Sequence, residues 1–294
     1  MKIAYLEIDG VRTVAMAHTD GNLYSIPRLL ALSGAGIPVP GTVLDAAADG
    51  TALANAVSNA IASLTMSGDT EQAIVPSASR LLAPLPRPNR ILAIGRNYAE
   101  HAKEQGASVT EEPIVFLKAS QSVIAPDEAI RIPEGIGRVD FEAELMVVLG
   151  SGGKNIVEAD AMSHVAGYTV FNDVTARTMQ KKAQSSNHPW FLSKSLDTFG
   201  PMGPYLITPD EVPDPHDLRI SLTVNGEPKQ DDTTASMVFR IPFLIAYLSR
   251  FFALEPGDVI ATGTPSGIGA IVPGDIVSVV VEGIGTLSNP VEAA

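Results

Sequence analysis

The stretch 138-RVDFEAELMVVLG-150 combines two patterns on one predicted strand. Acidic residues occupy every second position, at Asp140, Glu142 and Glu144, and the strand continues into the apolar segment 145–149. Side chains two residues apart on a strand share a face, roughly 6.6 Å from one another along the backbone. Three carboxylates so arranged repel one another unless a positive charge lies between them. The pattern predicts either a charged edge strand in solvent or a strand that carries a cation site into a core.

Short β-like runs between turns dominate the chain after residue 90. These runs are ILAIG (91–95), PIVFLKA (113–119), ELMVVLG (144–150), HVAGYTVFND (164–173), RISLTVNG (219–226), DVIATG (258–263) and DIVSVVVEGIG (275–285). Helical segments are predicted only at 98–105, 158–162 and 238–252, too few for the regular crossovers of a parallel doubly wound sheet. We therefore predict a mostly β catalytic domain that closes as a roll, barrel or sandwich.

The first 85 residues have a different pattern and are predicted to form a small α+β domain. The expected elements are strands at 2–8, 11–18 and 23–26, a turn at Asp9-Gly10 and an alanine-rich helical segment at 44–64. Prolines then break regular structure between residues 76 and 88. We place the boundary there, between domains 1–85 and 86–294.

Composition excludes several functional classes. A net charge of −13 argues against a nucleic-acid partner, which needs clustered Lys and Arg. The absence of cysteine excludes disulfides, thiolate metal sites and a cysteine nucleophile. No run approaches the ~20 apolar residues of a membrane span, and Glu7 and Asp9 are unlike a signal peptide. We expect a cytoplasmic protein without a membrane partner. For an anionic substrate, it would need a divalent cation and selected Arg and Lys residues.

The segment 95-GRNYAEHAKEQG-106 predicts a short helix that carries a candidate general base. His101 and Glu104 are three residues apart, so they share one helix face and the carboxylate can orient the imidazole. An exposed helical turn with ordinary charges is the alternative interpretation. The segment 99–112, with Gly106 as a hinge, is a candidate lid that would order over bound substrate and exclude water.

Two further clusters place polar groups in apolar surroundings. In 167-GYTVFNDVTARTMQ-180 an apolar strand ends at Asp173, which could equally be a helix N-cap. In 190-WFLSKSLDTFGPMGP-204, Lys194 lies in an apolar context, where a lysine either extends to solvent or is held for function. Together the clusters supply three hard carboxylate ligands of the kind that Mg²⁺ prefers. They also supply donors for an oxyanion or a carboxylate, namely Lys194, Arg177 and Gln180.

The order of these motifs is similar to that of the fumarylacetoacetate hydrolase family. The shared pattern reads GRNYxxH, FxKxxxS, DFExEL, NDVTARxxQ, KSxDTFxPxGP, TVNGE and ATGTPSGIG. The resemblance implies an α+β, mostly β fold with a mixed β-roll catalytic domain, a homodimer, and a bound Mg²⁺, with Mn²⁺ or Ca²⁺ as alternatives. It further implies a hydrolase acting on carbon–carbon bonds in ketonic substances. The substrate would be a small anionic oxo acid, an acylpyruvate or fumarylpyruvate, cleaved through a metal-bound enolate.

Matched residue by residue, the resemblance also implies roles. The metal ligands would be Glu142, Glu144 and Asp173. The catalytic residues would be His101 and Glu104, which activate water, and Lys194 and Gln180, which contact the reacting carbonyl. The substrate-binding residues would be Arg177, Thr264, Arg96 and Tyr98.

The chain departs from the family pattern at one position. Many members have an acidic residue directly after the arginine of the TAR motif, whereas Thr178 follows Arg177 here. What orients Arg177 is therefore an open question. Asp140 is expected to form hydrogen bonds where the strand begins and not to bind the metal.

Three alternatives to hydrolysis differ in what the site residues would do. The first is a decarboxylase or isomerase that uses the same cage on oxaloacetate or a 2-hydroxydienedioate. The presence of both His101 and Glu104 favours hydrolysis over this alternative. The second is a catalytically silent binder, which predicts damage to the base or the lysine, and both are intact. The third, a structural protein with a stabilising ion, leaves His101, Gln180 and Lys194 without a role.

Overall fold

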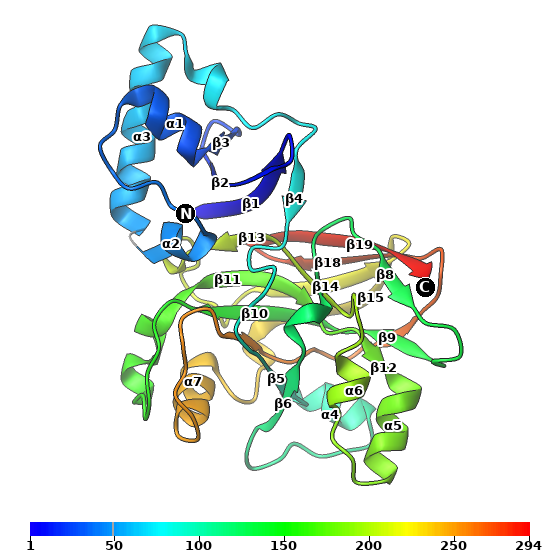
Figure 1. Ribbon diagram of the computed structural model, residues 1–294. Coiled ribbons are helices and arrows are strands. Elements are labelled where there is room, and N and C mark those ends of the chain that lie inside the picture. Colours follow the sequence, from blue (N-terminus) through cyan, green and yellow to red (C-terminus); the bar gives the residue numbers. More distant parts are fainter. Residues whose placement is uncertain (49) are drawn as a thin grey trace.

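The structure is a computed structural model that describes residues 1–48 and 50–294 (Figure 1). The largest sheet of the described residues has the spatial order β3 (Leu23–Ser25), β2 (Val11–Ala17), β1 (Lys2–Ile8), β13 (Gly200–Ile207), β11 (Val165–Asn172), β10 (Ala143–Leu149), β16 (Val259–Ala261), β5 (Ile91–Gly95) and β6 (Ile114–Lys118). Two short strands join its sides, β4 (Arg80–Leu82) beside β1 and β7 (Val123–Ile124) beside β13. This sheet crosses the whole molecule.

Two smaller sheets complete the β structure of the described residues. One has the order β15 (Glu227–Thr233), β14 (Arg219–Val224), β18 (Ile276–Val281), β19 (Gly285–Ala293) and β8 (Ile130–Ile132). The other has the order β12 (Thr175–Ala176), β9 (Val139–Phe141) and β17 (Gly269–Ile271). The α+β, mostly β prediction for the chain is confirmed.

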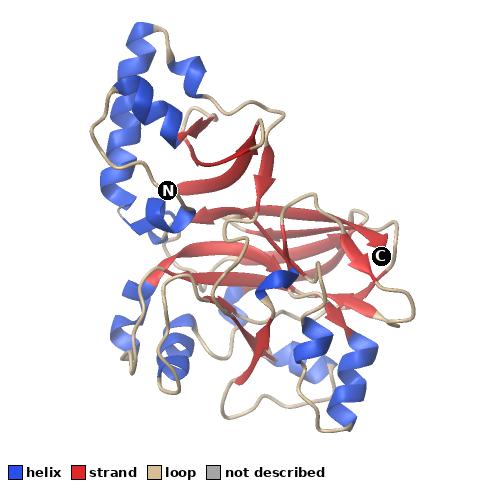
Figure 2. Ribbon diagram, viewed as in Figure 1, coloured by secondary structure: helices blue, strands red, loops and turns tan. Residues whose placement is uncertain are grey.

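Helices lie around the strands and not between them (Figure 2). The α-helices are α1 (Ile26–Ser33), α2 (Val43–Ala48), α3 (Gly50–Ser67), α4 (Ala99–Glu104), α5 (Arg177–Ser185), α6 (Phe191–Lys194) and α7 (Ile241–Ser249). The 3₁₀ turns are η1 (Thr70–Ala73), η2 (Ser120–Ser122), η3 (Glu158–His164), η4 (Pro209–Glu211) and η5 (Thr234–Ser236). None of the helices in the described part of the chain has both the length and the apolar character to cross a membrane.

The N-terminal elements follow the sequence pattern closely. Strands β1 and β2 form an antiparallel hairpin in which Lys2 faces Ala17. Asp9 and Gly10 have φ of 50° and 79°, the positive values that a two-residue hairpin turn needs. The apolar spacing predicted at 44–64 appears in α3, which buries Leu53 and Leu64 among other residues.

The N-terminal sheet is continuous with the catalytic sheet. Lys2 and Ile3 of β1 pair with Ile207 and Leu206 of β13, so the same ladder crosses the predicted domain boundary. One cluster of buried apolar side chains contains residues from both sides of that boundary. The division at residues 85 and 86 stays a prediction, and the two parts share a sheet and a core.

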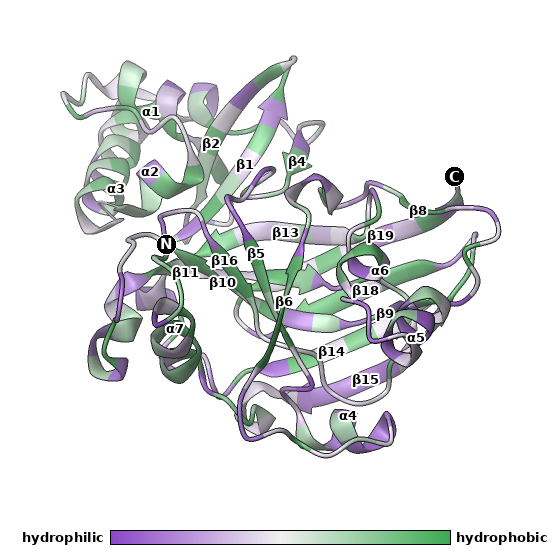
Figure 3. Cartoon of the chain, turned by 60° about the horizontal axis from the view of Figure 1, so that its bottom comes forward, coloured by the Kyte–Doolittle hydropathy of each residue, from purple (hydrophilic) through white to green (hydrophobic). Residues whose placement is uncertain are grey.

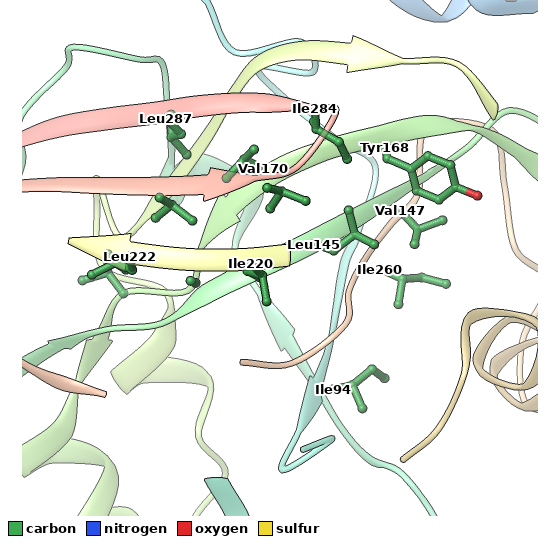
Figure 4. Packing of buried hydrophobic residues seen from close by; sticks show 14 of the residues in the cluster. Ile94, Leu145, Val147, Tyr168, Val170, Ile220, Leu222, Ile260, Ile284 and Leu287 are labelled. Carbon is green, nitrogen blue, oxygen red and sulfur yellow. The ribbon is translucent and has the colours of Figure 1, made fainter. Parts of the chain in front are cut away.

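The core of the catalytic part lies between the central strands and the sheet of β14, β18 and β19. Every residue of β10 and β11 is buried, and Figure 3 shows both strands as hydrophobic along much of their length. Figure 4 shows Leu145 and Val170 packing toward Ile220 and Leu287 of the facing sheet. Each such side chain contributes about 1.5–3 kcal/mol when it is fully buried. This packing holds the ends of β10 and β11 in place.

The acidic stretch is not one strand. Strand β9 ends at Phe141 and β10 begins at Ala143, so Glu142 lies between them. The backbone N–H of Glu142 donates to the Asn172 side chain (3.0 Å), and the Asp173 N–H donates to the Glu142 carbonyl (2.9 Å). A side-chain acceptor thus replaces a strand partner at Glu142, which corrects the prediction of a single strand.

Two predicted helices also differ from the structure, and the helices α1, α5 and α6 were not predicted. Residues 158–162 lie in the 3₁₀ turn η3. Helix α7 begins at Ile241, later than predicted, with Pro242 in its first turn, a position where proline's missing N–H costs nothing. Helix α5 was missed because its sequence, RTMQKKAQS, is polar apart from Met179 and Ala183, too few apolar residues to establish a helical period.

Candidate metal centre and active site

Three acidic side chains converge where the central strands begin and end. Glu142 directly precedes β10, Glu144 is the second residue of β10, and Asp173 directly follows β11. Ala143 pairs with Asn172 across the two strands. One oxygen atom from each carboxylate lies within 4.8 Å of the others, and all three side chains are buried. Such a set of hard oxygen donors fits a divalent cation. The residues predicted to be ligands are therefore brought together.

Glu144 lacks a positive partner of its own. Among the described residues, the only hydrogen bond to its carboxylate comes from the backbone N–H of Gly263 (2.9 Å). Burial, together with the negative charges of Asp173 and Glu142, raises the pKa of Glu144 well above its ordinary value. A cation between the three carboxylates would remove this repulsion, which is a second reason why the residues fit a metal ion.

Lys194 carries its ammonium group into the carboxylate cluster. Its Nζ lies 2.7 Å from Glu142 Oε2 and 2.5 Å from Asp173 Oδ2. Burial alone would lower the pKa of Lys194, but the attraction of Asp173 and Glu142 prevails and raises the pKa above its ordinary value. The lysine is thus protonated at neutral pH, as a hydrogen-bond donor to an oxyanion requires.

Lys118 is a second buried lysine that sequence reasoning did not assign to the site. Its Nζ lies 2.7 Å from Asp173 Oδ1, an ion pair without hydrogen-bond geometry, and it donates to the carbonyls of Val174 and Lys194. Burial lowers the pKa of Lys118, and the charge of Asp173 offsets this only in part. The signal was present, since Ile114, Phe116 and Lys118 form the inward face of the alternating strand β6.

Asp140 orients Arg177, which answers the question raised by Thr178. Asp140 is fully buried, accepts from Arg177 Nε (2.8 Å) and from Arg138 Nε (2.6 Å), and is not part of the carboxylate cluster. Arg177 also donates to Glu142 and, at 2.5 Å, to Gln180 Oε1. Because the carbonyl oxygen of Gln180 is held in this way, its amide N–H groups remain available as donors.

His101 is held as a base between two neighbours on α4 and the turn after it. Glu104 Oε2 lies 3.4 Å from Nδ1, and Gln105 Nε2 lies 3.0 Å from Nε2. Glu104 is itself held by the backbone N–H of Gly267 (3.2 Å to each oxygen). A proton on Nδ1 satisfies Glu104 and leaves Nε2 as the basic atom, which accepts from the Gln105 amide until a substrate proton replaces that donor. Burial lowers the pKa of His101, so the imidazole is neutral at neutral pH.

One cavity collects most of the predicted site residues. Those in its wall are Arg96, His101, Glu142, Glu144, Asp173, Arg177, Gln180, Lys194 and Thr264. Glu104 lines a neighbouring cavity that shares Arg96, Gln105, Arg177 and Gln180 with the first. Helices α4, α5 and α6 lie together at this end of the molecule (Figure 1). The elements that carry the base, the guanidinium and the lysine therefore meet at the carboxylate cluster.

Tyr98 is the exception among the predicted residues. Its side chain is 1% exposed and packs in the main core, and it lines neither cavity. Its hydroxyl has no hydrogen-bond partner among the described residues, and burial raises its pKa. The structure does not bring Tyr98 to the site wall. The predicted lid, 99–112, contains α4, and its closure stays a prediction.

The family model described as "Fumarylacetoacetate (FAA) hydrolase C-terminal" matches residues 90–292. The chain belongs to the fumarylacetoacetate hydrolase family. The match covers the carboxylate cluster, both lysines and the His101–Glu104 pair, which confirms the resemblance read from the motifs. The match therefore identifies the family of this chain and does not identify the reaction.

Similar proteins of this family carry names for three different reactions. The mitochondrial oxaloacetate tautomerase fahd2 of Xenopus laevis is 46% identical over 231 residues, 76% of this chain and 72% of that protein. The maleylpyruvate hydrolase of Sphingobium, solved with manganese(II) and pyruvate, has a TM-score of 0.79 and 29% identity over the full length of both chains. The 5-carboxymethyl-2-hydroxymuconate delta-isomerase of Mycobacterium smegmatis has a TM-score of 0.77 and 32% identity, covering 100% of this chain and 99% of that one.

Proposed function

We propose that this chain interconverts the keto and enol forms of a small 2-oxo acid, with oxaloacetate as the substrate. The observation that carries the proposal is that the buried imidazole of His101 lies in the same cavity as three convergent carboxylates and Lys194. Enolisation needs these parts: a base for a proton on carbon and positive charge for the oxygen that becomes negative. The name of the Xenopus relative, at 46% identity, supports oxaloacetate tautomerisation.

The site residues have two separate tasks in this reaction: the carboxylates hold positive charge near the substrate oxygens, and His101 transfers the proton. A divalent ion held by Glu142, Glu144 and Asp173 would supply positive charge to the oxo and carboxylate oxygens of the substrate. Mg²⁺ is our proposed ion, and Mn²⁺, which the hydrolase structure contains, is the alternative. His101 Nε2 takes a proton from the carbon beside the oxo group, breaking a C–H bond and forming an N–H bond. The imidazolium then returns that proton to the oxygen, giving the enol.

Lys194 and Gln180 stabilise the oxygen on which negative charge develops. The ammonium of Lys194 and the free amide N–H groups of Gln180 both line the cavity. Arg177 keeps Gln180 in place and is itself fixed by Asp140. Asp140 therefore acts as a positioning residue, with Arg177 and Gln180 between it and the substrate.

Hydrolysis of a carbon–carbon bond in an acylpyruvate or fumarylpyruvate is the second candidate. One observation favours it: Glu104 and Gln105, which flank His101, line a second cavity with room for water and an acyl group. In that reaction the same Nε2 would take a proton from water, which attacks the distal carbonyl. The cytoplasmic location and the homodimer stay predictions, and the Xenopus relative is mitochondrial by name.

A substrate panel with Mg²⁺ or Mn²⁺ tests this proposal. We expect the purified chain to accelerate the decay of enol-oxaloacetate absorbance without releasing pyruvate above the uncatalysed rate. Acetylpyruvate and fumarylpyruvate, assayed for pyruvate formation, should be turned over much more slowly. Pyruvate formation from fumarylpyruvate with a higher kcat/KM than oxaloacetate tautomerisation would instead identify a hydrolase.

Lys194→Met is expected to lower kcat by about 10²–10³, the usual effect of losing one donor to a developing oxyanion. Methionine retains the length of the side chain and removes its charge. Lys103→Met, which changes an exposed lysine on α4, is the matched control and should leave kcat unchanged. Borohydride trapping of a covalent substrate adduct would contradict this role, because it would make Lys194 a Schiff-base nucleophile.

A further inference from the structure

A second cavity of about 340 Å³ adjoins the metal centre. Arg96, Arg177 and Gln180 lie in the walls of both cavities, so a molecule bound at the carboxylates can extend into the second one. Four positively charged side chains line this second cavity, Arg96, Arg138, Arg177 and Lys181, against two carboxylates, Glu104 and Asp140. In a chain with a net charge of −13, this is a local concentration of positive charge.

The arginine side chains of this cavity differ in whether a carboxylate of the protein already pairs with them. Arg138 and Arg177 both donate to Asp140. Arg96 forms no ion pair and no side-chain hydrogen bond with the described part of the chain, and its Nε is buried without a partner. A buried donor without an acceptor costs free energy, which a bound acceptor would recover. Arg96 is thus the arginine at this cavity that lacks an anion.

The backbone at Arg96 is also held in an unfavourable conformation. Arg96 directly follows β5 and has φ of 55°, a value that residues other than glycine rarely adopt. The guanidinium lies over Trp190, with Cζ 5.9 Å from the ring centroid. A Cβ at Gly95 would come within 2.9 Å of the same ring, so the glycine allows Trp190 this close approach. Strain kept in this way at a cavity wall is typical of residues fixed for binding.

We propose that Arg96 binds the distal carboxylate of the substrate and makes the enzyme selective for 2-oxo dicarboxylates over 2-oxo monocarboxylates. This inference rests on the proposed function, in which the oxo-acid end lies at the carboxylate cluster. The planar guanidinium offers two parallel N–H donors that match a carboxylate. Because Arg96 lines both cavities, a substrate that extends from the carboxylate cluster into the second cavity passes this residue. A monocarboxylic 2-oxo acid would leave Arg96 unpaired, as it is in the structure.

Two inert five-carbon ligands test the inference by calorimetry on the Mn²⁺-loaded chain. The dicarboxylate 2-oxoglutarate should bind roughly 10- to 100-fold more tightly than 2-oxovalerate, the range for a hydrogen-bonded charged pair. Arg96→Met should abolish this preference and leave the affinity for 2-oxovalerate almost unchanged. Arg96→Lys, which retains the charge without the planar fork, should keep only part of the preference. Because Arg96→Lys retains the positive charge, it also serves as a second variant in case loss of that charge in Arg96→Met prevents folding.

Arg138→Met is the matched control, because Arg138 lines the same cavity but is paired with Asp140. It should retain the dicarboxylate preference. An Arg96→Met variant with the wild-type preference, or an equal loss in Arg138→Met, would overturn the assignment. Oxaloacetate tautomerisation by the wild type is measured separately. Its absence would refute the proposed function, whereas an unchanged preference in Arg96→Met with normal tautomerisation would refute only the role of Arg96.

Discussion

Glu142→Ala is expected to abolish turnover and to reduce Mg²⁺ or Mn²⁺ binding below detection. The change removes one of three hard anionic ligands. It also leaves Arg177 and Lys194, both hydrogen-bonded to Glu142, with less negative charge to offset their own. These two cations would then oppose the entry of a third. Asp173→Ala should have the same effect, since Asp173 shares Lys194 and also pairs with Lys118.

The measurement is a metal titration followed by calorimetry, with turnover assayed on the same samples. Removing a buried carboxylate also destabilises the protein, because its partners stay charged. Glu142→Gln is therefore included, since it keeps the shape of the side chain and loses only the charge. Asp231→Ala, at an exposed ion pair with Arg219, is the control and should change neither property. Full activity of the metal-stripped wild type in excess chelator would contradict the metal centre.

The carboxylate cluster could be predicted from two local patterns together with the family resemblance. The alternation of acidic residues paired Glu142 with Glu144, although the structure breaks the strand at Glu142. Asp173 followed an apolar strand, and the resemblance added it to the ligand set. Neither inference needed the tertiary fold beyond the pairing of two central strands. The N-terminal hairpin was predictable for a similar reason, since Asp9-Gly10 selects a two-residue turn and the turn sets the register.

Other features depend on contacts that no local pattern contains. The break at Glu142 arises from the side chain of Asn172, thirty residues later in the chain. The pairing of β1 with β13 joins residues about two hundred positions apart. Lys118 lies on the inward face of its strand, where a lysine is normally costly, and the charge of Asp173 together with the carbonyls of Val174 and Lys194 offsets that cost. Contacts between residues so far apart in the chain depend on tertiary packing and not on the secondary-structure propensity of the local sequence.

His101→Ala is expected to lower kcat by roughly 10²–10⁴, the usual contribution of a positioned general base. The affinity for the metal should change little, because His101 is not part of the carboxylate cluster. His188→Ala, which removes an exposed histidine, is the control and should leave kcat unchanged. Wild-type rates in His101→Ala would remove this residue from the mechanism.

The pH profile gives His101 a signature that a merely structural residue would lack. Burial lowers the pKa of His101 below its ordinary value of about 6.5, although Glu142 and Glu104 partly oppose this effect. The base is active when neutral, so kcat/KM should fall as the pH drops through this lowered pKa. Glu104→Gln removes one of the charges that raise the pKa, and should shift the acid limb to still lower pH. The limb should be absent in His101→Ala.

The His101→Ala variant also separates the two candidate reactions, because His101 takes its proton from carbon in tautomerisation and from water in hydrolysis. In tautomerisation Nε2 takes the proton directly from carbon, so loss of the imidazole should slow oxaloacetate enolisation by the full factor. In hydrolysis the imidazole delivers water, and enolisation would then continue at nearly the wild-type rate while cleavage of fumarylpyruvate stops. Deuterium exchange at the carbon beside the oxo group, followed by NMR, measures the first step without the second. Loss of exchange in His101→Ala places the base at the carbon atom.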